Sequence, residues 1–206
     1  MNLAKLIRTS GWTLALGGLL LICAEIVYIL YPGNPEVRGI TTASRISASF
    51  FFSGALLLTV GLPGVYLRQA ERAGAFGRVA FLLALAGSAL MIASDWNELF
   101  ADPALMLIPN FDTELPVSLL AGYMLNYATY TLGWLLFGIA TLRARVLPRP
   151  LALLLIGGIL LPFVMLFIRH FPGDFMPCYI AFAWPGLTAA RAERPAPAPL
   201  AEPAAA

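Results

Sequence analysis

Long apolar runs separated by short polar segments divide the chain into six predicted helices. An α-helix rises about 1.5 Å per residue, so about 20 apolar residues are needed to cross the hydrocarbon core of a membrane. The predicted spans are residues 11–31, 44–67, 77–101, 117–141, 150–170 and 175–190. We therefore expect an all-α, polytopic transmembrane helix bundle over residues 1–190. Because the last run is short and contains two prolines, five spans plus a re-entrant or interfacial helix are the alternative.

Composition and charge also favour a membrane protein. Hydrophobic residues make up 60% of the 206 residues and charged residues 12%, whereas soluble domains average about 25% charged residues. With the N-terminus inside, ten basic residues fall on the cytoplasmic side and three outside, as the positive-inside rule requires. We therefore expect an inner (plasma) membrane location with both termini cytoplasmic. The Ala- and Pro-rich tail, residues 191–206, is expected to be disordered.

Polar side chains recur at helical spacing within four of the predicted spans. The third span carries Asp95 and Glu98 one turn apart, and the first carries Glu25 and Tyr28 at the same spacing. The row predicted on one face of the fourth span consists of Tyr123, Asn126, Tyr127, Tyr130, Thr131 and Trp134. Lipid offers such groups no hydrogen-bond partners, so each row should face another helix or water. The candidate ligand-binding residues are Glu25, Tyr28, Arg45, Asp95, Glu98, Tyr123, Asn126, Tyr127, Tyr130, Arg169 and His170.

Depth along the helices predicts a polar vestibule that opens to the outside. Glu25 and Asp95 each lie about six residues, roughly 9 Å, below the outer ends of their spans. We expect the two carboxyls to face each other as its floor, with Asn126 or Tyr127 close by, and not to be ionised together. On this interpretation Asp95→Asn keeps the fold, whereas Asp95→Leu costs about 1–3 kcal/mol because a buried partner loses its hydrogen bond.

Several functions are compatible with this cluster. Helix-end carboxylates that pair with Arg45 or Arg169 would be structural only. A pocket would make the chain a binding or accessory subunit for a lipid, an apolar small molecule or a membrane-protein partner, which we favour because no motif demands catalysis. The alternatives are an intramembrane acid–base enzyme, with Glu25, Asp95 or Glu98 as catalytic candidates, and a small transporter. A proton path is less favoured because the inner half of the spans holds no acidic residue to continue it.

Other ligand classes find less support. His170 is the one histidine of the chain, and no HxxxH, ExxH or CxxC spacing is present, so no metal site is predicted. No motif assigns a cofactor. Nucleic-acid binding is not expected, because the chain lacks a basic patch interleaved with aromatic residues. The lipid bilayer is therefore the first expected partner.

One segment resembles other proteins. Residues 133–138 read Gly-Trp-Leu-Leu-Phe-Gly, residues 142–149 read Leu-Arg-Ala-Arg-Val-Leu-Pro-Arg, and an apolar run with Gly157-Gly158 follows. This helix–loop–helix resembles one in small uncharacterised bacterial inner-membrane proteins with several spans, over the fourth and fifth spans only. The resemblance implies a bacterial inner-membrane location and assigns no activity or catalytic residue.

Overall fold

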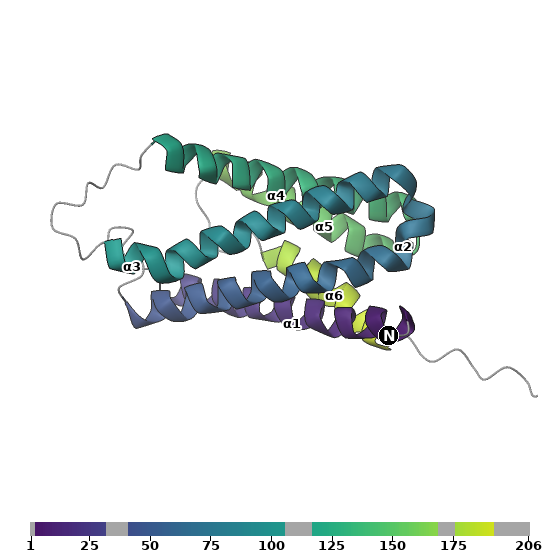
Figure 1. Ribbon diagram of the computed structural model, residues 1–206, viewed down its shortest axis with the longest axis horizontal. Coiled ribbons are helices and arrows are strands. Elements are labelled where there is room, and N and C mark those ends of the chain that lie inside the picture. The colour runs from purple at the N-terminus through teal and green to yellow at the C-terminus, as the bar shows by residue number, and fades with distance from the viewer. Residues whose placement is uncertain (1–2, 32–40, 106–116, 169–175, 192–206) are drawn as a thin grey trace, which may run out of the picture.

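The described part of the chain is built from helices. The computed structural model describes residues 3–31, 41–105, 117–168 and 176–191, and no β-strand occurs among them. The elements are α1 (Leu3–Leu30), α2 (Thr42–Trp96), the π-helical turn η2 (Asn97–Ala101), α3 (Asp102–Leu105), α4 (Val117–Ala144), α5 (Arg149–Ile168) and α6 (Met176–Arg191) (Figure 1). The expected all-α fold is confirmed for these residues. The predicted disordered tail lies outside the described residues, except for Arg191.

Helix α2 consists of two arms joined at Gly74. This glycine has φ 60° and ψ −154°, a backbone conformation essentially confined to glycine, and the helix reverses direction there (Figure 1). At the start of the first arm, the Thr41 hydroxyl accepts a hydrogen bond from the Ser44 backbone N–H at 3.1 Å and caps the helix. The arms correspond to the second and third predicted spans, but their connection is helical on both sides of the glycine rather than a loop.

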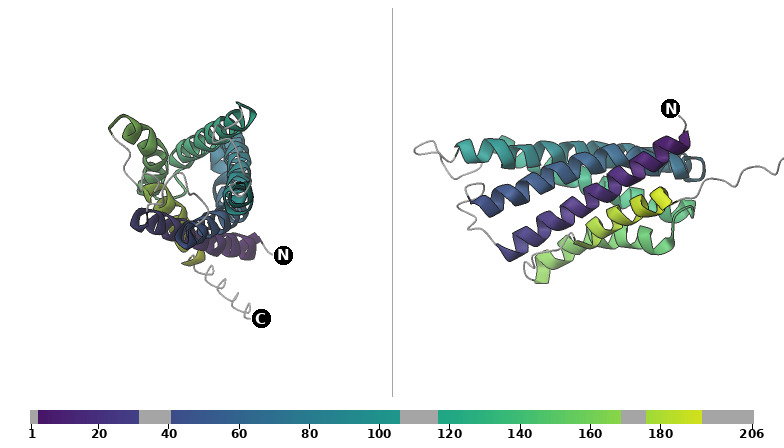
Figure 2. Two further views of the ribbon diagram at one scale, coloured as in Figure 1. Left: turned by 90° about the vertical axis from the view of Figure 1, so that its left-hand side faces the viewer. Right: turned by 90° about the horizontal axis from the view of Figure 1, so that it is seen from below.

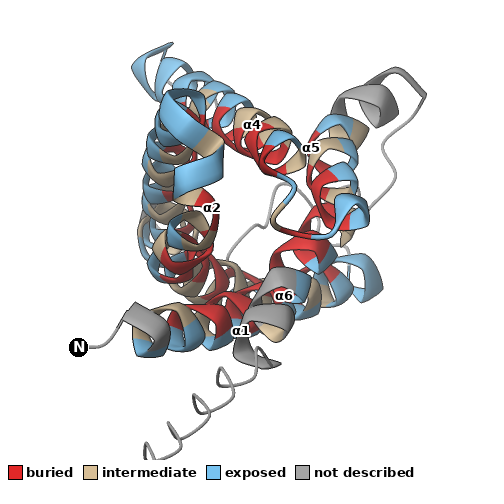
Figure 3. Cartoon of the chain, turned by 90° about the vertical axis from the view of Figure 1, so that its right-hand side faces the viewer, coloured by how far each residue is buried: buried red, intermediate tan, exposed pale blue. Residues whose placement is uncertain are grey.

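The helices form a closed ring. Each long helix packs against the next one along the chain, α1 on α2, α2 on α4, α4 on α5 and α5 on α6, and α6 returns to pack on α1. The end-on view in Figure 2 shows this ring, and Figure 3 shows that the buried residues lie on the inner faces of the helices. Side chains from helices far apart in sequence therefore meet along one central axis.

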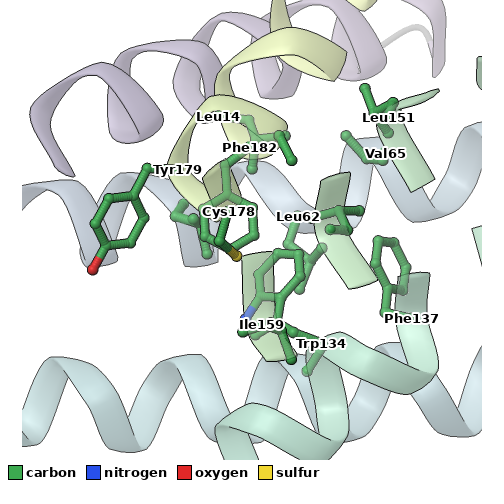
Figure 4. Close-up of a cluster of buried hydrophobic side chains, with 14 of the residues drawn as sticks. Leu14, Leu62, Val65, Trp134, Phe137, Leu151, Ile159, Cys178, Tyr179 and Phe182 are labelled. Atoms are coloured by element: carbon green, nitrogen blue, oxygen red, sulfur yellow. The ribbon is translucent and has the colours of Figure 1, made fainter. Parts of the chain in front are cut away.

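Large apolar side chains fill the middle of the ring. Trp134 and Phe137 of α4, Phe182 of α6 and Leu62 of α2 are almost completely buried, and Figure 4 shows them in one cluster. The Trp134 and Phe182 rings lie 4.3 Å apart between centroids. We call these four residues the apolar layer. Polar groups on its two sides form separate clusters, because a close-packed apolar layer holds no water.

Glycines let α2 and α4 approach closely. A Cβ atom at Gly133 would lie 2.5 Å from the Ala84 backbone nitrogen, and a Cβ atom at Gly87 would overlap the backbone of Tyr130. Small residues at helix contacts are frequent in membrane proteins, because van der Waals packing replaces the hydrophobic effect as the force between helices. This contact fixes Tyr130 against the second arm of α2.

Two continuous helical stretches are long and apolar enough to cross a membrane, judged by length and composition. They are Lys5–Leu30 and Thr42–Ala104, and the second contains both arms of α2. Helix α4 has 28 residues, but its Tyr, Asn and Thr residues lower its mean hydropathy. The apolar part of α5, Arg149–Pro162, is shorter. These findings agree with a membrane location, and the number of six spans stays a prediction.

Candidate functional site

A small cavity lies inside the ring, between α1, both arms of α2, α4 and α6. It has room for about one water molecule. Its walls are mainly apolar, and four polar side chains reach it. The lining residues are Leu21, Phe51, Ala55, Leu58, Ser88, Met91, Asp95, Tyr130 and Tyr179. An apolar cavity with a few convergent polar groups is the usual form of a binding site.

Asp95 is the charged residue of the cavity. It is the penultimate residue of α2, two residues before η2 begins, and is 6% exposed. Within the described parts of the chain, no hydrogen bond or basic side chain pairs with its carboxyl group, and the neighbouring charge that acts on it is Glu98, one helical turn away. Burying a carboxyl group without a partner is costly in an apolar bundle, so Asp95 marks a candidate site.

Three aromatic side chains form the walls beside Asp95. Tyr130 comes from α4, Tyr179 from α6 and Phe51 from the first arm of α2. The Phe51 and Tyr179 rings meet edge to face with centroids 6.4 Å apart. Both tyrosines are buried and lie within electrostatic reach of the Asp95 carboxyl. The cavity is thus surrounded by aromatic rings and two phenol hydroxyls.

Hydrogen bonds from α4 hold the second arm of α2 in place beside the cavity. Trp134 Nε1 donates to Ser88 Oγ at 3.1 Å, and Asn126 Nδ2 donates to Ser94 Oγ at 2.7 Å. The same Asn126 amide nitrogen lies 3.7 Å from Met91 Sδ. These contacts fix the register between α2 and α4, and with it the positions of Ser88 and Met91 in the cavity wall.

The structure brings together only part of the predicted site. Asp95 and Tyr130 both line the cavity. Glu25 of α1 is buried and acts electrostatically on Tyr179, but it does not line the cavity. Asn126 is buried behind the wall. The expected face-to-face pair of Glu25 and Asp95 stays a prediction, and Tyr179 lies within electrostatic reach of both carboxyls.

Tyr28 and Tyr127 do not line the cavity. Their side chains are 44% and 45% exposed. On α4, the buried face includes Asn126 and Tyr130, and Tyr127 lies about 100° around the helix from Asn126. The polar row predicted on this helix is therefore wider than the face that the fold buries.

Tyr123, Arg45 and Glu98 lie nearer the end of the bundle. The Tyr123 hydroxyl accepts a hydrogen bond from Asn97 Nδ2 at 3.1 Å. Arg45 is exposed and Glu98 half-buried, and each takes part in an interaction. The predicted site residues that lie outside the described part of the chain are Arg169 and His170.

Two aromatic cavity residues, Tyr179 and Phe51, were missed by the sequence interpretation. Tyr179 carries the same signal as Tyr130, a phenol hydroxyl within an apolar helix that needs a hydrogen-bond partner. It could have been found by treating the sixth span like the fourth. Phe51 carries no such signal, because an aromatic residue within an apolar span looks the same whether it faces lipid, core or ligand.

A second buried polar cluster lies on the far side of the apolar layer. Gln69 Nε2 donates to Thr141 Oγ1 at 2.9 Å, and both side chains are completely buried. Gln69 Oε1 has no hydrogen-bond partner among the described residues. This cluster belongs to the Gly74 end of the bundle and is separate from the cavity.

The described residues contain no group of three or more His, Cys, Asp or Glu side chains that could hold a metal ion. Comparison with known proteins finds no match for this chain among family models, curated proteins or solved structures. The chemistry of the cavity is therefore argued from its own groups: one buried carboxyl, two phenols, one hydroxyl and an apolar wall.

Proposed function

We propose that the chain is a multi-pass integral membrane protein of six spans. We also propose that the cavity in its outer half binds the polar end of a lipid or of another, largely apolar small molecule. The observation that carries this proposal is the buried Asp95 carboxyl, which lines the cavity without a partner in the described residues. Ionisable groups in a membrane bundle are rare and usually serve function. A bound ligand would offset the cost of burying this one.

The outer surface of the helices supports a location in lipid. Val60 and Val79 on the two arms of α2, Leu132 on α4 and Leu153 on α5 are between 54% and 57% exposed. Extended apolar surface is unfavourable in water, where it marks an interaction or membrane site. Acyl chains around the ring would cover these side chains.

Charge along the bundle axis supports the orientation. Basic residues gather at the start of α1, on both sides of Gly74, at the end of α4 and at the start of α5, and these ends lie together (Figure 1). Asp95, Glu98 and Asp102 lie at the opposite end. By the positive-inside rule, this distribution supports an orientation with the Gly74 end in the cytoplasm and the Asp95 end outside.

Cysteine labelling in intact cells tests this topology. The parent for the test carries Cys23→Ala and Cys178→Ala. A membrane-impermeant maleimide should label the Val117→Cys variant, at the start of α4, from outside. It should label Ala75→Cys, next to Gly74, only after the membrane is opened. The reverse pattern would overturn the orientation, and equal labelling of both variants in intact cells would mean that no membrane separates the two ends.

Native mass spectrometry of the purified full chain tests binding at the cavity. Ala55 lines the cavity, so Ala55→Leu adds an isopropyl group to its wall and should remove a bound lipid or small molecule. Ala128→Leu adds the same bulk on the exposed face of α4 and should retain it. Equal occupancy in the wild type and in a folded Ala55→Leu variant would contradict the proposal.

The geometry supports binding better than the other functions considered from the sequence. An acid–base enzyme is less favoured, because two of its three catalytic candidates, Glu25 and Glu98, do not line the cavity. A transporter is less favoured, because the apolar layer around Trp134 separates the cavity from the Gln69–Thr141 pair.

A further inference from the structure

The charge of the cavity points to a cationic ligand. The Asp95 carboxyl lines the cavity and is 6% exposed, and none of the described residues that line the cavity is basic. Glu98, one helical turn away, acts on the same carboxyl and adds to the negative potential. A group with a positive charge would complement both carboxyls, whereas an anion would be repelled.

The size of the cavity restricts the cation. It has room for about one water molecule, and a primary ammonium group is of about that size and donates three hydrogen bonds. A trimethylammonium group is several times larger and does not fit. A bare divalent metal ion is a poor match, because it needs about six oxygen ligands and the cavity offers a single carboxyl group beside three neutral hydroxyl groups.

The aromatic walls suit an ammonium group. Cations within about 6 Å of an aromatic ring are attracted by its electron-rich face, and Phe51, Tyr130 and Tyr179 surround the cavity. The phenol oxygens can accept hydrogen bonds from the ammonium group. The apolar side chains of Leu21 and Leu58 can contact the hydrocarbon attached to the nitrogen.

We propose that the cavity is a site for a primary ammonium group carried by an apolar or amphipathic molecule, with Asp95 as its counter-ion and Tyr130 and Tyr179 as its hydrogen-bonding walls. This inference rests on the membrane binding site proposed above and specifies the ligand of that site. Two sources carry this chemistry: free alkylamines and the ethanolamine headgroup of phospholipids.

Calorimetric titration of the full chain in a maltoside detergent tests charge and size separately. The probes are hexylammonium, hexyltrimethylammonium and 1-hexanol, which share the same alkyl chain. Hexylammonium should bind at least about tenfold more tightly than the other two, because only it can fill the cavity and pair with the carboxylate. Equal affinity for hexylammonium and 1-hexanol would refute the role of charge, and equal affinity for both cations would refute the size restriction.

Two matched variants locate the charge. Asp95→Asn keeps the shape of the side chain and removes its charge, so it should weaken hexylammonium binding at least about tenfold. Glu71→Gln makes the same change at an exposed position near Gly74 and should leave the affinity within about twofold. Undiminished binding to Asp95→Asn would overturn the proposal. The three-probe comparison uses the wild type and does not depend on the folding of either variant.

Nanodiscs distinguish the two sources of the ammonium group. Hexylammonium binding is measured in phosphatidylethanolamine and in phosphatidylcholine with the same acyl chains. Competition by phosphatidylethanolamine alone would identify the lipid headgroup as the ligand, and absence of competition by either lipid would identify a free amine. Both outcomes support an ammonium site, whereas equal competition by the two lipids would contradict it.

Failure of this inference can be told apart from failure of the proposed function. If 1-hexanol binds as well as hexylammonium and Ala55→Leu abolishes both, the cavity is a binding site for a neutral ligand and only the ammonium assignment is wrong. If Ala55→Leu changes the binding of no probe, the binding site itself is wrong.

Discussion

Alanine in place of Gly133 should force α4 away from the second arm of α2. The new Cβ atom would lie 2.5 Å from the Ala84 backbone nitrogen and 2.6 Å from both Ala84 Cα and the Leu83 carbonyl carbon, whereas ordinary contacts begin at 3.4 Å. The helices must therefore separate locally by about 0.9 Å. A gap of that size removes about a quarter to a half of the attraction of each affected contact. Because backbone atoms cannot rotate away, we expect a loss near the top of the usual range for overpacking, about 2–3 kcal/mol.

Gly122→Ala is the matched control on the same helix. Nothing lies within 4 Å of a Cβ at this position, so the variant should gain about 0.5–1 kcal/mol from the lower entropy of its unfolded chain. Reversible unfolding in mixed micelles, followed by the fluorescence of the four tryptophans, measures both. Equal free energies of unfolding for the two variants would refute the close contact between α2 and α4.

Three further changes test the buried polar groups, each by the free energy of unfolding in the same assay. Thr141→Val should cost about 1–3 kcal/mol because it leaves the buried Gln69 amide without its partner. A double-mutant cycle with Gln69→Leu should give a coupling energy of at least about 0.5 kcal/mol. Additive effects of the two substitutions would contradict the hydrogen bond. Trp134→Phe should cost about 1–3 kcal/mol by removing the donor to Ser88 and leaving a void, and Ser88→Ala should add little in that background. Asp95→Leu should leave the ligand-free protein unchanged or more stable by up to about 2 kcal/mol, because no described partner loses a hydrogen bond; a loss above about 1 kcal/mol would reveal a partner.

The helices could be predicted from the sequence because an apolar run of sufficient length is a local property of the chain. The corner at Gly74 could not. Four of the residues 68–73 are polar or charged, which is typical of a loop, but the segment also consists of good helix formers such as Ala70, Glu71 and Arg72. The helix therefore continues up to Gly74, which adopts a backbone conformation that other residues rarely adopt.

The site could be predicted only where helical periodicity decides it. Asp95 and Tyr130 were assigned to inner faces by spacing, and both line the cavity. Tyr127 was assigned to the same face as Tyr130, but helix packing buries a narrower arc than the polar row covers. The expected loss of stability in Asp95→Leu assumed a hydrogen-bonded partner, and whether a carboxyl has one is a property of tertiary contacts that no spacing reveals.

The closure of the ring by α6 has a consequence for biosynthesis. Tyr179 lies on α6, which is synthesised after the other described helices, and α6 completes the cavity by docking on α1, where a Cβ atom at Gly18 would overlap Ala183. Until that helix docks, the nascent bundle presents an open seam with Asp95 near it. A chain that stalls before residue 176 would expose this carboxyl group to lipid or water and lack one wall of the cavity. Such an intermediate is the form that membrane chaperones and proteases would be able to distinguish from the finished protein.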